Sequence, residues 1–300
     1  MVGFFLVLGA SALWAVDTLI RYPLINKGVG SFSVVFYEHL ILSSIFLIIF
    51  YKKIPSFFKI PRKHVLYFFI VGAIGSGFST LAFTKAFHFL NPSLVILLQK
   101  FQPVVAISLA SVILKERVGP MFILWAIICI LGAFLISYDD IINLFSSRAN
   151  FLTIISQPGS FQGYILVIFS IFGWGSSTVF GKKLLKIGYQ DEEVMAGRFI
   201  LGLVSLLPFI PFYSGLFSHE LNVYGNISLM VLVSGLLAMY LYYHGLRKLS
   251  ARACSLTELS FPFMAVIVNW VFLDAKLTLI QLLGGLLLLL GSIIIQLKRY

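Results

Sequence analysis

Residues 91–119 read NPSLVILLQKFQPVVAISLASVILKERVG, an apolar run with one polar cluster and one proline that ends in a charged turn. A second copy, SARACSLTELSFPFMAVIVNWVFLDAKLT, occupies residues 250–278. When Pro103 is aligned with Pro262, Gln99 aligns with Glu258. One such run suits a buried soluble helix as well as a membrane span, but its repetition indicates a duplicated membrane architecture, as in many transporters.

The composition predicts an integral membrane protein. Hydrophobic residues make up 60% of the chain and charged residues 11%, against about 25% charged residues in soluble domains. The 300 residues accommodate about ten spans of roughly 20 residues each. A net charge of +11 would suggest nucleic acid as the partner of a soluble protein, but here it fits basic loops on the cytoplasmic face of a lipid bilayer. We therefore expect no nucleic-acid partner.

Motifs of enzymes and pumps are missing from the sequence. Cys129 and Cys254 lie inside apolar runs without metal-type or redox-type spacing, so we predict buried thiols. Nothing resembles a Walker loop, a zinc site or a nucleophile elbow. We predict no catalytic residue, no metal and no cofactor, and an ATP-driven pump is not expected.

Hydropathy predicts an all-α protein with ten transmembrane helices in two repeats of five. The predicted spans are 3–21, 32–51, 65–87, 92–114, 119–138, 162–181, 193–213, 227–246, 253–273 and 278–297. Residues 1–138 form the first repeat, residues 139–161 an extracytoplasmic linker, and residues 162–300 the second repeat. Because five is odd, the second repeat enters from the opposite side, and the repeats are inverted around a central cavity.

Basic residues predict the orientation. If the N-terminus is cytoplasmic, fifteen of the 22 Lys and Arg residues fall in inside connections, four lie in outside connections or at their edges, Arg21 among them, and three lie within spans. We expect cytoplasmic termini in a plasma membrane, such as the bacterial inner membrane. For the oligomeric state, both a monomer and a homodimer are compatible with the sequence.

The pattern resembles the EamA-type members of the drug/metabolite transporter superfamily over nearly the whole chain. The resemblance rests on Ala12-Leu13-Trp14-Ala15, Gly173-Trp174-Gly175, Arg198-Phe199, the Pro103 and Pro262 helices, and the turn Leu114-Lys115-Glu116-Arg117. His39 departs from the arginine often found there, and Asp274-Ala275 from a Gly-Glu. The resemblance implies alternating-access transport of a small metabolite, often an amino acid or a related compound, with export common.

Ionisable groups within spans are costly, so they face a cavity or a partner. The candidates for substrate binding or ion coupling are Asp17, Glu38, His39, Gln99, Lys100, Arg198 and Glu258. Glu258 and Arg198 lie at similar depth and are either a cavity site or a structural ion pair. For Glu38 and Lys100 we favour a structural ion pair. Asp17 has no evident partner at its depth, so proton or cation coupling and a hydrogen bond to a neighbour are both open.

Aromatic residues and prolines add two further expectations. Trp14, Trp174 and Tyr242 lie near the level of the polar groups and fit a pocket with aromatic walls, although most aromatics in such proteins face lipid or pack between helices. Pro103 and Pro262 each remove a backbone hydrogen bond, either as hinges or as static kinks.

We predict a secondary transporter for an amino acid or similar zwitterion, with a proton or other ion as an open coupling partner. The alternatives are an exchanger of nucleotide-like or adenosyl metabolites, favoured if Lys100 and Arg198 line the cavity unpaired, and a membrane enzyme or lipid-handling scaffold. The last class would need a polar cluster at the membrane interface, whereas these polar groups lie within spans.

Overall fold

The computed structural model describes residues 1–49, 60–90, 92–145, 159–213, 215–216, 218–273 and 277–298. The predicted departures Asp274 and Ala275, the basic residues of segment 50–59, and Arg148 in the linker lie outside these residues. Within the described part, nine helical segments are long and apolar enough to cross a membrane, and Pro120–Ile136 is a shorter apolar helix. Together they correspond to the ten predicted spans, and the all-helical membrane fold is confirmed.

The first repeat contains helices α1 to α8. Their bounds are α1 Val2–Asn26, α2 Ser31–Ile49, α4 Arg62–Phe69, α5 Ser79–Ala86, α6 Pro92–Gln99, α7 Gln102–Ile113 and α8 Pro120–Ile136, with a π-helical segment, η2 Ile70–Phe78, joining α4 to α5. A short helix, α9 Tyr138–Phe145, follows in the predicted linker. The first span is longer than predicted, because α1 continues past residue 21 to Asn26.

The second repeat has the same order of helices, with an additional 3₁₀ helix, η3, after α12. Its bounds are α11 Ser160–Ile187, α12 Asp191–Leu206, η3 Leu207–Phe212, α13 Leu221–Met230, η4 Val231–Leu237, α14 Ala238–Lys248, α15 Ala251–Glu258, α16 Ser260–Leu273 and α17 Leu279–Lys298. The segments η2 and η4 are both π-helical and contain the aligned pairs Gly75-Ser76 and Ser234-Gly235. Wide helical turns of this kind are frequent at functional sites.

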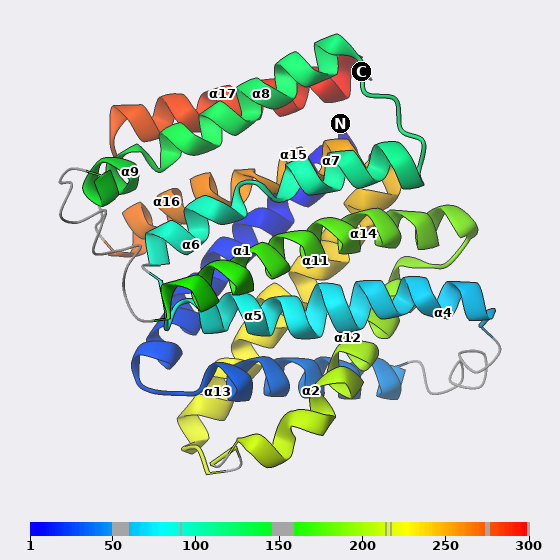
Figure 1. Ribbon diagram of the computed structural model, residues 1–300, viewed down its shortest axis with the longest axis vertical. Coiled ribbons are helices and arrows are strands. Elements are labelled where there is room, and N and C mark those ends of the chain that lie inside the picture. The colour runs from blue at the N-terminus through cyan, green and yellow to red at the C-terminus, as the bar shows by residue number, and fades with distance from the viewer. Residues whose placement is uncertain are drawn as a thin grey trace.

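The repeats interlock through their first helices. In the first repeat α1 packs against α14 and α16, and in the second α11 packs against α5 and α7. Because α11 is the counterpart of α1, α14 of α5 and α16 of α7, each first helix lies against the other repeat's third and fourth spans. Figure 1 shows α11 beside α5, and α8 beside α17 at the edge of the bundle.

Close packing of α8 on α17 depends on two glycines. A Cβ atom added at Gly132 would lie 2.6 Å from the carbonyl oxygen of Gly284, and one at Gly284 equally close to that of Gly132. Small residues let two membrane helices approach to backbone contact.

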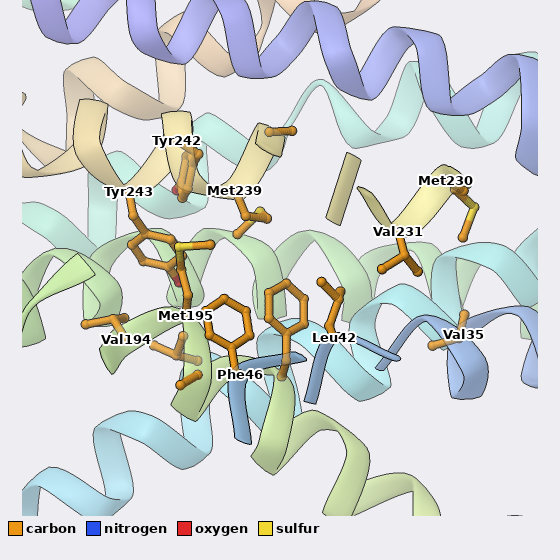
Figure 2. Packing of buried hydrophobic residues seen from close by; sticks show 14 of the residues in the cluster. Val35, Leu42, Phe46, Val194, Met195, Met230, Val231, Met239, Tyr242 and Tyr243 are labelled. Carbon is orange, nitrogen blue, oxygen red and sulfur yellow. The ribbon is translucent and has the colours of Figure 1, made fainter. Parts of the chain in front are cut away.

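A buried apolar cluster brings together α2, α12 and α14. Figure 2 shows Phe46 of α2, Met195 of α12 and Tyr243 of α14 gathered in it. Tyr243 and Met195 are almost fully buried, at 0% and 1% exposure. The adjacent Tyr242 is therefore held on a fixed scaffold.

Candidate functional site: a cavity between the repeats

A cavity of about 250 Å³ lies between the two repeats. On α1 its lining runs from Trp14 to Ile25, and on the third span from Ser76 to Phe87. Both spans begin at the end of the bundle that carries the chain termini, so the cavity reaches toward the opposite end (Figure 1). At the terminal end the helices are closed, since a Cβ atom at Gly245 would lie 2.9 Å from the carbonyl oxygen of Gly3.

Most of the sequence-predicted site residues line this cavity. They are Trp14, Asp17, Glu38, Gln99, Lys100, Pro103, Trp174, Arg198, Tyr242, Glu258 and Pro262.

His39 is the exception. Its Nδ1 lies 2.8 Å from the carbonyl oxygen of Val35 and its Nε2 lies 2.9 Å from Ser76 Oγ, and the ring packs closely on Gly202. The position of His39 along its helix was predicted from the sequence. The direction in which its side chain points is set by packing against α12.

Two aromatic pairs line the cavity. The rings of Trp14 and Tyr242 have centroids 5.5 Å apart, and those of Phe83 and Trp174 have centroids 4.8 Å apart. Each pair joins one repeat to the other. Together they give the cavity aromatic surface from four different helices.

Glu258 is the last residue of α15, where the span breaks before Pro262. Its carboxylate accepts hydrogen bonds from Gln102 Nε2 at 2.9 Å, Tyr242 OH at 3.0 Å and Thr178 Oγ1 at 3.3 Å. Gln102 is the first residue of α7, directly after the matching break of the first repeat. The two broken spans therefore meet at this carboxylate.

Arg198 uses a separate set of partners. Its Nη1 donates to Ser177 Oγ at 2.8 Å and to Tyr243 OH at 3.4 Å, and its Nη2 donates to the carbonyl oxygen of Gly75 at 3.1 Å. Among the described residues no salt bridge joins Arg198 to Glu258. The structural ion pair considered for these residues is thus not formed in this conformation.

Arg21 organises a charged cluster at the open half of the cavity. Its Nε donates to Asp17 Oδ2 at 2.6 Å, and its Nη2 donates to Glu38 Oε2 at 3.1 Å. Ser234 Oγ donates to Asp17 Oδ1 at 2.5 Å. The hydrogen bond from Ser234 agrees with one of the two alternatives left open for Asp17. The expectation that Glu38 pairs with Lys100 is wrong, because Glu38 pairs with Arg21. Because α1 continues to Asn26, Arg21 lies inside the span, one turn beyond Asp17.

Gln99 is the last residue of α6, and Lys100 lies in the break between α6 and α7. Both line the cavity. Lys100 is 1% exposed, and its Nζ has no hydrogen-bond partner in the described part of the chain. A buried amino group without a hydrogen-bond partner is costly, which marks Lys100 as a candidate contact for an electronegative substrate group.

Sequence reasoning missed Arg21, Gln102, Thr178 and Ser234 as lining residues. One signal was available for Arg21, since its spacing of four residues from Asp17 places both side chains on one helix face. Thr178 follows Trp174 by four residues, as Thr18 follows Trp14, so the repeat alignment also pointed to it.

Comparison with known proteins assigns the architecture to a family. The model of the EamA-like transporter family matches residues 1–138 and 161–297. The riboflavin transporter ImpX of Fusobacterium nucleatum is 29% identical over 300 residues, covering 97% of this chain and 96% of the relative. An uncharacterized transporter of Archaeoglobus fulgidus is 27% identical, covering 66% of this chain and 65% of its own length. One solved crystal structure superposes with a TM-score of 0.74 at 14% identity over 97% of this chain and 96% of its own, a similarity of fold. The chain belongs to the EamA-like transporter family and is a multi-pass membrane transporter, not an enzyme.

Proposed function

We propose that this transporter carries riboflavin or a closely related flavin. The observation that carries the proposal is the aromatic lining of a cavity that both repeats build, in a chain that aligns over nearly its full length with a riboflavin transporter. Riboflavin combines a flat fused ring, an edge of carbonyl and N–H groups, and an uncharged polyhydroxyl chain. Apolar pockets with a few placed polar groups suit such a molecule.

The charge balance of the cavity supports an uncharged substrate. Asp17 and Glu38 are engaged with Arg21, and Glu258 is surrounded by uncharged hydrogen-bond donors. The amides of Gln99 and Gln102 line the same space and offer hydrogen bonds to hydroxyl and carbonyl groups.

The transport cycle that we propose is alternating access between the inverted repeats. In the described conformation the cavity reaches toward the end of the bundle opposite the termini, while the helices pack closely at the terminal end. If the termini are cytoplasmic, this conformation faces outward. Export, which the family resemblance implied, is a prediction about direction that right-side-out and inside-out vesicles distinguish.

An amino acid or related zwitterion is the second candidate, because both signs of charge line the cavity. A nucleotide-like anion is a third, because Lys100 and Arg198 both line the cavity and the Nζ of Lys100 has no hydrogen-bond partner among the described residues. In this structure, however, the cavity carboxylates and guanidinium groups largely bond to protein atoms, which favours the flavin.

Transport by purified protein in proteoliposomes tests the proposal. Radiolabelled riboflavin, an amino-acid mixture and adenosyl metabolites are compared with and without a pH gradient, with empty liposomes as the control. We expect saturable riboflavin flux above empty liposomes. Flux of amino acids or adenosyl compounds without riboflavin flux would overturn the proposal, and dependence on the gradient would identify proton coupling.

A further inference from the structure

The two aromatic pairs of the cavity are related by the internal repeat. Phe83 and Tyr242 occupy the same position in the alignment that superposes Pro103 on Pro262, and Trp14 corresponds to Trp174 with one residue of drift. Each tryptophan packs on the partner aromatic of the opposite repeat, with ring centroids 5.5 Å apart for Trp14 and Tyr242 and 4.8 Å apart for Phe83 and Trp174.

All four rings line one cavity. Interhelical packing alone would be served equally well by aliphatic side chains in these places. A matched pair of aromatic surfaces contributed by both repeats is instead the arrangement that binds a flat π-system by stacking.

We propose that these two pairs form a clamp that binds the planar ring of the substrate, so that the ring and not its side chain determines recognition. The inference deepens the proposed flavin function and rests on it for the choice of ring. It also assigns roles to Phe83, which the sequence did not single out, and to Tyr242.

The two halves of the clamp differ in polarity. Tyr242 donates its hydroxyl to Glu258 at 3.0 Å, whereas the corresponding residues of the first repeat are Phe83 and Gln99. A ring held in the clamp therefore meets a carboxylate on one side and an amide on the other. This difference orients a heterocycle whose edges carry different hydrogen-bonding groups.

The four tryptophans of the chain allow a direct test. Trp270 is 51% exposed on α16, and Trp125 lies on the peripheral α8. The double variant Trp125→Phe/Trp270→Phe keeps the two clamp tryptophans as the only tryptophans, and these are excited selectively at wavelengths that tyrosine does not absorb. We expect riboflavin and lumiflavin, which has the ring without the ribityl chain, to quench this fluorescence with similar affinity, and ribitol to leave it unchanged.

Substitution of the clamp gives a second readout. In the same background, Trp14→Leu and Trp174→Leu should each weaken lumiflavin binding about tenfold, because one stacking surface is lost, and Trp14→Phe should retain most of the affinity. Riboflavin binding that leaves both tryptophans unquenched, or ribitol that competes where lumiflavin does not, would overturn the clamp. The quenching result stands even if a leucine variant does not fold.

Failure of the flavin proposal is distinguishable from failure of the clamp. If riboflavin does not bind, the same protein is titrated with another flat compound, adenosine, and with the non-aromatic leucine and glutamate. Quenching by a flat compound alone supports the clamp for a different ring. Binding of only non-aromatic compounds, or of none, overturns both proposals.

Discussion

Glu116, in the turn after α7, caps the N-terminus of α15 through Ala251. One carboxylate oxygen of Glu116 lies 3.0 Å from the amide nitrogen of Ala251, and the other lies 3.2 Å from that of Arg252. The first amides of a helix have no partner within it, and a carboxylate there is favoured by the helix dipole. The contact joins the first repeat to the second at the end of the bundle where the cavity is closed.

We expect Glu116→Ala to open the terminal end of the bundle. Hydrogen bonds to a charged group contribute about 1.5–3 kcal/mol, so loss of this contact should raise the population of the state open at that end about tenfold. Cys254, buried one turn before Glu258, then reacts faster with a maleimide. The measurement uses a Cys129→Ser background, so that Cys254 is the only thiol. Unchanged labelling would show that Glu116 does not hold the closed state, and Glu192→Ala at the start of α12 is the matched acidic control.

The orientation is tested by reporter fusions. The distribution of Lys and Arg predicts a cytoplasmic signal after Lys63, Lys186 and Arg252 and an outside signal near Arg148 and His219. Opposite signals from Lys63 and His219 are required, because the connections they occupy follow an even and an odd number of spans. A cytoplasmic signal near Arg148 would place both repeats in one orientation and contradict the predicted topology.

Removal of Arg21 should destabilise the fold more than it affects binding. Arg21→Met leaves Asp17 and Glu38 without their cation, at a cost of about 3–5 kcal/mol, seen as a lower thermal unfolding temperature in detergent. The triple variant Asp17→Asn/Arg21→Met/Glu38→Gln removes every charge of the cluster and should recover most of that stability. A triple variant as unstable as Arg21→Met would show that the cluster is not held by charge pairing.

The sequence was sufficient for the ten spans and the two broken helices because apolar runs and prolines act locally. It also placed most of the cavity residues within spans, where the structure has them. The hydrogen-bond and ion-pair partners of these residues could not be predicted from position along a span. Asp17 meets Ser234 and Glu38 meets Arg21 only because α1, α2 and η4 pack side by side, and one prediction failed because the end of the first span was placed at Arg21 and not at Asn26.

The direction in which each side chain points around its helix was the other property that could not be predicted from the sequence. Glu38 and His39 are neighbours at one depth, yet Glu38 lines the cavity while His39 bonds Ser76 within the packing against α12. Successive helical residues point about 100° apart, so a one-residue step decides between the cavity and the helix contact. Only the packed structure shows which side is which.

Variants of the two broken-span prolines distinguish a hinge from a static kink. Pro103 is the second residue of α7 and Pro262 the third of α16, directly after the interruptions in each span. As hinges, Pro103→Ala and Pro262→Ala should slow turnover several-fold while the substrate Kd stays within a few-fold, because gating and binding are separate steps. Pro120→Ala, at the start of the peripheral α8, is the control. Equal turnover in all three variants would favour the static kink.

Glu258 and Arg198 lie on either side of the adjacent tyrosines of α14. Tyr242 donates to Glu258 at 3.0 Å, and Tyr243 accepts from Arg198 at 3.4 Å. A pair that only held the helices together would have its charges in contact, whereas here each charge bonds uncharged groups and both residues line the cavity. This arrangement predicts a role for Glu258 toward the substrate or a coupled proton.

Glu258→Gln tests that role because the amide keeps the shape and one carbonyl acceptor for Tyr242. We expect the variant to fold with an unfolding temperature close to that of the parent, yet to lose at least tenfold in transport or to lose its dependence on pH. Neutralising Arg198 as well should not restore activity. If the two charges instead stabilise each other across the tyrosines, either single variant leaves an uncompensated buried charge at a cost of about 3–5 kcal/mol, and Glu258→Gln/Arg198→Gln recovers folding and flux together. A fully active double variant would therefore exclude the functional role of Glu258.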